Sequence, residues 1–246
     1  MRILGFFKKL FNKIIDFIFP PSCPLCGATV SVDGELCGDC WSCFNWIDGP
    51  ICARCGYPLP TDFDKSANLV CPNCSSEKCE LDFVRAACVY DEMSRTAVLP
   101  FKHCGKIKYS KFMSRAMIWA LRDVNILPDV IMPVPLANRR LFHRGYNQAT
   151  LLARPISVVY NAKLDVDSVR RTYRENMGHK TSNQRYKNIH GVFNVVNQEN
   201  IRGKKILLVD DVMTSGATFA ELCRVLRRAG ASAVYGVVFC RVVRAD

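Results

Sequence analysis

The sequence predicts an α/β protein with a parallel sheet and helices on both faces, preceded by a small cysteine-rich module and an amphipathic helix. Three observations support this prediction. Residues 1–19 carry apolar side chains at helical spacing, residues 20–79 hold four Cys-x-x-Cys pairs, and residues 80–246 alternate strand-like with helix-like segments. Such alternation is typical of a parallel sheet. We therefore expect three parts, divided after residues 19 and 79.

The composition narrows the class of protein. Of the 246 residues, 49% are hydrophobic, which is enough for a sizeable core, and the formal net charge is +12. A basic surface attracts nucleotides, nucleic acid or an anionic membrane face. Fourteen cysteines without a cleavable signal peptide favour metal binding in the cytoplasm over a disulfide scaffold. No apolar run reaches the roughly 18 residues of a transmembrane helix.

Residues 1–19 predict an amphipathic helix with one broad apolar face and with Lys9 and Lys13 towards the other. Pro20 and Pro21 end it. Two roles stay open for this helix: docking on its own protein, or binding a partner or an anionic membrane surface.

The four Cys-x-x-Cys pairs predict two structural zinc sites. A gap of two residues lets both thiolates of a pair reach one tetrahedral ion, and a site closed by four thiolates folds the module and leaves no position for chemistry. The predicted ligands are Cys23, Cys26, Cys37 and Cys40 for the first ion, and Cys52, Cys55, Cys71 and Cys74 for the second.

Two points qualify the zinc prediction. Cys43 and Cys79 lie near enough in the sequence to replace one of these ligands. Each four-thiolate site with one dication carries −2, so two sites lower the net charge from +12 to about +8. The chain stays basic.

The third part predicts alternating strands and helices. Strands are expected over residues 83–90, 130–134 and 233–243, with an edge strand over 191–196, and helices over 93–102 and 109–124. A basic turn over residues 139–149 precedes a further helix to about residue 160.

Residues 206–228 predict a phosphate-binding strand, loop and helix. The apolar strand Ile206–Val209 is ended by Asp210 and Asp211, and a hydroxyl-rich loop then precedes an amphipathic helix. In a parallel sheet the ligand lies at the carboxyl ends of the strands, where a tight loop and a helix N-terminus hold phosphate. The two acids would face sugar hydroxyls or a magnesium ion.

This stretch resembles the 5-phosphoribosyl-1-pyrophosphate (PRPP) motif of type I phosphoribosyltransferases. The resemblance implies that Asp210 and Asp211 bind the ribose hydroxyls of Mg²⁺-bound PRPP, and these acids are also the catalytic candidates. The residues implied to wrap the 5′-phosphate are Thr214, Ser215, Gly216, Ala217 and Thr218.

Two further segments are similar to parts of the same transferases. Val134, Pro135 and Leu136 resemble the pyrophosphate loop, whose backbone N–H groups would face pyrophosphate. Residues 170–188 resemble a flexible loop that closes over the substrate, with a surface coil as the alternative. In the basic turn, Arg144 and its neighbouring arginines suit phosphate, whereas an Asn-Gln pair suits a base or amide.

The chain is similar to the ComF family over residues 20 to 243. The similarity rests on the cysteine pairs, on Val134-Pro-Leu with Arg144-Gly-Tyr-Asn-Gln-Ala149, and on Val209-Asp-Asp-Val-Met-Thr-Ser-Gly. It implies a zinc module joined to a type I phosphoribosyltransferase-like domain, in cytoplasmic proteins of bacteria that take up DNA by natural transformation. The implied partners are single-stranded DNA, and competence or DNA-processing proteins or the inner membrane surface through the first helix.

Two functions stay open. One is a DNA-uptake factor that binds PRPP and holds single-stranded DNA with basic loops and the aromatic residues Trp41, Phe44 and Trp46, which would otherwise form the small core of the zinc module. The other is an active phosphoribosyltransferase with an unknown acceptor. Thr214 stands where purine-specific members carry a third acid, so no general base is evident.

Overall fold

A computed structural model describes residues 20–60, 62, 69–76, 81–172 and 190–243. The helix predicted over residues 1–19, the proposed boundary at Glu80 and the alternative ligand Cys79 lie outside the described residues. Residues 173–189, most of the predicted flexible loop, also lie outside them.

A five-stranded sheet forms the centre of the fold, in the order β1-β7-β6-β2-β3, and each neighbouring pair is parallel. The predicted parallel α/β fold is therefore confirmed. The strands are β1 Phe83–Val89, β2 Val130–Pro133, β3 Lys163–Leu164, β6 Lys205–Met213 and β7 Ala233–Arg241.

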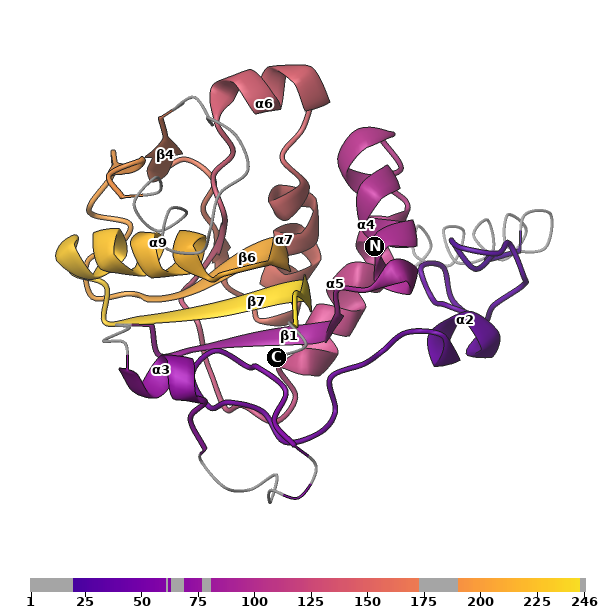
Figure 1. The fold of residues 1–246 in the computed structure, drawn as a ribbon. Coiled ribbons are helices and arrows are strands. Elements are labelled where there is room, and N and C mark those ends of the chain that lie inside the picture. The colour runs from indigo at the N-terminus through magenta and orange to yellow at the C-terminus, as the bar shows by residue number, and fades with distance from the viewer. Residues whose placement is uncertain (1–19, 61, 63–68, 77–80, 173–189, 244–246) are drawn as a thin grey trace, which may run out of the picture.

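Helices cover both faces of this sheet (Figure 1). On one face Phe112 and Leu152 of two helices pack against Leu207 of β6, and on the other Leu222 packs with Leu208. None of the helices in the described part is long and apolar enough to cross a bilayer. The helices are α4 Glu92–His103, α5 Tyr109–Ala120, α6 Asn138–Arg144, α7 Gln148–Val159 and α9 Ala217–Arg228.

The central strand β6 is longer than predicted. The prediction ended it at Val209, but pairing with β7 continues through Asp210 opposite Val238 to Met213 opposite Arg241. The pair of carboxylates interrupts the apolar run without interrupting the backbone ladder. The two acids consequently lie inside a strand, where successive side chains point to opposite faces.

Two other segments differ from their predictions. The strand predicted at the sheet edge is β5 (Phe193–Val195), which instead pairs antiparallel with β4 (Val169–Arg171) in a separate two-stranded sheet. The predicted basic turn contains the helix α6, which ends at Gly145 with φ of 74°. This left-handed conformation suits glycine and stops the helix before α7 begins.

The cysteine-rich module covers the free edge of β1. Its backbone pairs with that strand at three points: Ile47 N–H donates to the Ala87 carbonyl (2.9 Å), Val89 N–H to Asn45 (2.9 Å) and Val84 N–H to Arg54 (2.6 Å). A covered edge cannot pair with another chain. The module itself contains two short helices, α2 Gly38–Ser42 and α3 Pro72–Ser76.

We predict that Gly236→Ala destabilises the sheet. A Cβ on Gly236 of β7 would lie 2.7 Å from Cε1 of the buried Phe219, which packs on the strand from α9. The expected loss in the free energy of unfolding is about 1–3 kcal/mol, measured by urea denaturation. Gly49→Ala is the matched control, since its Cβ would meet no atom within 4 Å. Equal stability of the two variants would contradict this packing.

Candidate functional site

The acid pair near the end of β6 divides between the two faces of the sheet. The side chain of Asp211 lies on the same face of β6 as those of Leu207 and Val209. It contacts α4, where its Oδ1 lies 3.0 Å from the Nζ of Lys102. The side chain of Asp210 lies on the other face of β6 with that of Leu208, on the side of α9 and β4. Asp211 is buried, whereas Asp210 remains partly exposed. The two carboxylates therefore have different surroundings.

The environment of Asp210 favours its protonated form. Burial and the neighbouring charge of Asp211 raise the pKa of Asp210 from 3.8 to about 7, although Lys102 and Arg171 oppose the shift. Its Oδ1 also accepts a hydrogen bond from Asp211 N–H at 2.9 Å. A cation that joined this site would compete with the proton for the carboxylate.

The loop after β6 leads directly into the N-terminus of α9. Gly216 is the N-cap residue, with φ of 78°, and it has no side chain to cap the helix. Thr214 is exposed, Ser215 and Thr218 are partly exposed, and Ala217 is buried. Backbone N–H groups of a first helical turn and the helix dipole together favour an anion at this position.

The predicted pyrophosphate loop offers fewer N–H groups than expected. Val134 N–H donates to the Val209 carbonyl (2.8 Å), which extends the pairing of β2 with β6. Pro135 has no N–H group. Of the three residues, the half-buried Leu136 is the one whose N–H the sheet pairing does not use.

Three side chains just after Arg144 hold neighbouring segments of the site in place through hydrogen bonds to backbone carbonyls. The Tyr146 hydroxyl donates to the Phe101 carbonyl, Gln148 Nε2 donates to the Lys102 carbonyl (3.2 Å) and Asn147 Nδ2 donates to the Val134 carbonyl (3.1 Å). The sequence assigned Asn147 and Gln148 to a base or amide of a ligand. In the structure these amides instead bind backbone carbonyls and position the two segments that flank the acid pair.

Lys102 and Arg171 are two site residues to which the sequence gave no individual role. Lys102 lies in the last turn of α4 and pairs with Asp211, and Arg171 ends β4 within electrostatic reach of Asp210. Burial lowers the pKa of Arg171, and Asp210 raises it. Both roles depend on tertiary contacts that the sequence does not show: α4 brings Lys102 to Asp211, and β4 brings Arg171 close to Asp210.

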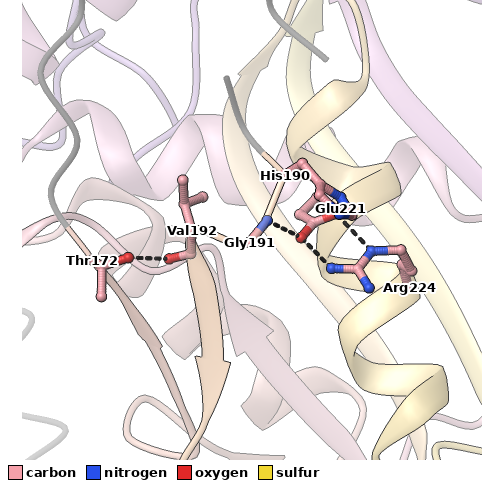
Figure 2. Close-up of polar contacts among 6 residues, drawn as sticks. All are labelled: Thr172, His190, Gly191, Val192, Glu221 and Arg224. Carbon is pink, nitrogen blue, oxygen red and sulfur yellow. Dashed lines mark hydrogen bonds and ion pairs between the residues drawn. The ribbon is translucent and has the colours of Figure 1, made fainter. Parts of the chain in front are cut away.

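Glu221 of α9 anchors the chain that returns towards β5 (Figure 2). Its carboxylate accepts from Gly191 N–H (2.7 Å) and from Arg224 Nε (2.8 Å), and His190 Nδ1 lies 3.3 Å away. Burial raises the pKa of Glu221, but these donors outweigh it and hold the pKa below 4.5. The second turn of α9 is thus fixed to the chain that leads into β5.

The cysteines gather into two clusters, and each has the predicted ligand set. Within each cluster the four sulfur atoms lie within 4.8 Å of one another: Cys23, Cys26, Cys37 and Cys40 form the first, and Cys52, Cys55, Cys71 and Cys74 the second. Cys43 is exposed and belongs to neither. A tetrahedral ion with Zn–S bonds of about 2.3 Å places sulfur atoms about 3.8 Å apart. The distances Cys26–Cys37 (3.5 Å) and Cys55–Cys71 (3.7 Å) fit this geometry.

Backbone N–H groups favour thiolates in both clusters. Burial raises the pKa of Cys23, but N–H donors outweigh it and lower the pKa to about 6. A hydrogen bond from Cys55, helped by N–H groups, lowers the pKa of Cys52 to about 4. The hydrogen bond with Cys52, together with burial, raises the pKa of Cys55 in turn. A dication that bound the thiolates would displace the remaining thiol protons, so the clusters are consistent with two zinc sites.

The aromatic residues beside the first cluster belong mostly to the core. Phe44 is 5% exposed and packs against Phe239 of β7, with ring centroids 6.0 Å apart. Trp46 stacks between Phe44 and Trp41. Trp41 is 42% exposed and retains an accessible surface. The interpretation as base platforms is therefore wrong for Phe44, which lies in the core of the sheet domain and not in a separate small core of the zinc module.

Comparison with known proteins first gives the class of the chain. A double zinc ribbon domain matches residues 14–77, and a phosphoribosyl transferase domain matches residues 111–244. The chain is therefore a phosphoribosyltransferase-fold protein with an N-terminal double zinc ribbon.

Three relatives then define the family. The chain is 29% identical over 231 residues to the DNA utilization protein YhgH of Escherichia coli K12 (91% of this chain, 98% of that protein). It is 30% identical over 203 residues to competence protein F of Haemophilus influenzae (78% and 86%) and 28% over 211 residues to competence protein ComFC of Bacillus subtilis (82% and 81%). The chain belongs to the ComF family.

We predict two zinc ions per chain and one in the variant Cys26→Ser, because removal of one thiolate opens one cluster and leaves the other complete. The measurement is metal content by elemental analysis of the purified protein. Cys43→Ser is the control and should retain both ions, since Cys43 lies outside the clusters. Loss of an ion from the control would mean that Cys43 is a ligand.

We also predict that Asp210→Asn stabilises the protein at alkaline pH. The folded pKa of Asp210, about 7, exceeds the unfolded value, so the native state binds this proton more tightly and the contribution of Asp210 to stability falls as pH rises from about 4 to 7. At pH 8 the variant should gain about 1–3 kcal/mol, after allowance for solvent screening, and at pH 4 almost nothing. The measurement is urea unfolding across this range.

The exposed Asp167→Asn is the control for this comparison. A gain in Asp210→Asn that is equal at pH 4 and pH 8 would show that the unfavourable charge is not the cause.

Proposed function

We propose that this protein serves DNA uptake in natural transformation, in the cytoplasm, and that its transferase-fold domain binds Mg²⁺ and PRPP. The names of its relatives, competence proteins and a DNA utilization protein, support the first part. One observation carries the second: two carboxylates near the end of β6 precede a helix whose N-cap residue is glycine. That combination suits a ligand with both sugar hydroxyls and phosphates.

Different residues of the site would bind different parts of PRPP. The loop from Thr214 to Thr218 would donate backbone and hydroxyl hydrogen bonds to the 5′-phosphate. Asp210, partly exposed and on the opposite face from Lys102, would take a ribose hydroxyl or the ion, whereas Asp211 would share its carboxylate with Lys102. Asp210 would hold magnesium, a hard cation that prefers oxygen ligands, and the ion would supply positive charge to the pyrophosphate of PRPP.

Proton release should accompany this binding. Asp210 has a pKa of about 7, so near neutral pH about half of the molecules carry a proton on this carboxyl. A hydroxyl or cation that needs the carboxylate form would displace that proton. Arg171, on the same side of the sheet, would limit the repulsion between Asp210 and an anionic ligand.

Catalysis of phosphoribosyl transfer is the second candidate. Asp210 favours it, because a carboxyl with a pKa near 7 can accept a proton at neutral pH. The chain would work by positioning PRPP and by placing Lys102 and Arg171 near the departing pyrophosphate. Thr214 occupies the place of the third acid and supplies no base.

Single-stranded DNA is the macromolecular partner in this proposal. A net charge of +12, or about +8 with two zinc ions bound, favours a polyanion. Lysines and arginines that bind phosphates release counterions, so affinity would fall steeply with added salt.

The experiment combines Asp210→Asn with Asp211→Asn and measures PRPP binding in the presence of Mg²⁺ by calorimetry. We expect at least a 100-fold loss of affinity, because the ribose and the ion lose both carboxylates (each charge-assisted hydrogen bond contributes about 1.5–3 kcal/mol). In a naturally transformable host the same variant should lose DNA uptake.

Zinc content and the urea midpoint of the double variant provide the controls for folding. Unchanged PRPP affinity would contradict the assignment of the site. Normal DNA uptake by a folded variant that no longer binds PRPP would contradict the link between this site and uptake.

A further inference from the structure

The helix α6 presents an aromatic side chain among arginines. Phe142 is 89% exposed and Leu141 is 39% exposed, although both lie in a regular helix. Arg139 and Arg140 are exposed, Arg144 is partly exposed, and Asn138–Arg144 contains no acidic residue. Figure 1 places α6 at the top of the molecule, far from α2 and α3 of the zinc module.

The cations of α6 differ in their partners from those near the zinc module. On α5 and just after it, Lys111, Arg115 and Arg122 each pair with an acid of the module: Asp33, Glu35 and Asp48 respectively. Within the described part of the chain, no ion pair involves Arg140 or Arg144. The cations that face the module are therefore neutralised by its acids, whereas no acid in the described part of the chain forms an ion pair with Arg140 or Arg144.

The α6 surface also adjoins the candidate PRPP site. The helix follows the loop Val134–Leu136 at the end of β2, which pairs with β6. The charge of Arg140 acts on Arg171, which in turn acts on Asp210. Phosphate groups bound along α6 would therefore lie close to the candidate PRPP site.

We propose that single-stranded DNA binds along α6, with a base stacked on Phe142 and backbone phosphates at Arg140 and Arg144. The inference rests on the proposed role in DNA uptake and names the surface that binds the strand. Aromatic platforms set among cations are the usual means of holding single strands, because an unpaired base exposes its ring face. Within duplex DNA that face is already stacked.

A membrane suits this surface less well. An interfacial helix buries a continuous apolar face over several turns, whereas α6 has seven residues and two exposed apolar side chains. Its cations are arginines, whose planar fork binds phosphate bidentately. The observations thus favour single-stranded nucleic acid over a membrane surface.

The test compares Phe142→Ala with wild type by fluorescence anisotropy, using labelled oligothymidylate and an abasic oligonucleotide of equal length. Loss of stacking should weaken binding of oligothymidylate about tenfold (base–aromatic stacking contributes about 1–3 kcal/mol per base) and should leave binding of the abasic strand unchanged. Phe142→Trp should restore affinity. Leu127→Ala, at a side chain that is 75% exposed elsewhere, is the matched control.

A second variant tests the binding of phosphates. Arg140→Gln should reduce the slope of log affinity against log salt by about 0.7 for each phosphate that the protein no longer neutralises. An unchanged slope together with unchanged affinity of Phe142→Ala for oligothymidylate would overturn the proposal. So would weaker binding of Phe142→Ala to phosphatidylglycerol vesicles with normal binding to DNA.

These outcomes separate the inference from the proposed function. If the wild-type protein bound neither oligonucleotide, single-stranded DNA would not be its partner and both proposals would fail. If wild type bound DNA with a steep salt response and Phe142→Ala behaved identically, the DNA-binding role would stand and the α6 surface would be wrong. PRPP binding by Phe142→Ala should equal that of wild type, because Phe142 lies outside the acid pair and the phosphate loop.

Discussion

The ion pair between Lys102 and Asp211 is the interaction on which the arrangement of the candidate site depends. It joins the end of α4 to the central strand β6 at 3.0 Å, in a place where the carboxylate is buried. A buried carboxylate without a cation would be costly. Two further side chains, Tyr146 and Gln148, fix the carbonyls of Phe101 and Lys102, so the position of the lysine is determined by the start of α7 as well. Three segments distant in sequence are thereby held at one edge of the sheet.

The same ion pair explains the difference between the two adjacent acids. Asp211 has its counter-ion on its own face of the sheet, whereas Asp210 lies across the strand and forms no such direct pair with a described residue. Its pKa rises to about 7 through burial and through the charge of Asp211. One extended strand thus produces a carboxylate and a partly protonated carboxyl from two identical residues, because alternation in a strand separates their surroundings.

The sequence predicted well those features that depend on local spacing. Cys-x-x-Cys pairs give the same eight ligands in the structure, since a gap of two residues already brings both sulfur atoms to one point. Strand and helix alternation likewise predicted the parallel sheet. The position of β7 between β1 and β6 was not predicted, because strand order depends on crossover connections between distant segments.

Features that depend on distant pairing were predicted poorly. The end of β6 was placed four residues too early, because its ladder with β7 is invisible in the apolar pattern. The N–H of Val134 was assigned to a ligand, although its partner is the Val209 carbonyl on the neighbouring strand. Phe44 was a candidate base platform until packing against Phe239 placed it in the core. In each case the deciding interaction joins residues that the sequence does not place together.

The distribution of ion pairs among the described residues differs between the zinc module and α6. Acids of the zinc module form ion pairs with cations on and just after α5, and these pairs help to hold the module to the sheet domain. The module also adds backbone hydrogen bonds to the edge of β1. On α6, by contrast, Arg140 and Arg144 form no ion pair with a described residue. This distribution of counter-ions fits a structural role for the zinc module, and it supports the proposed binding of a polyanion along α6.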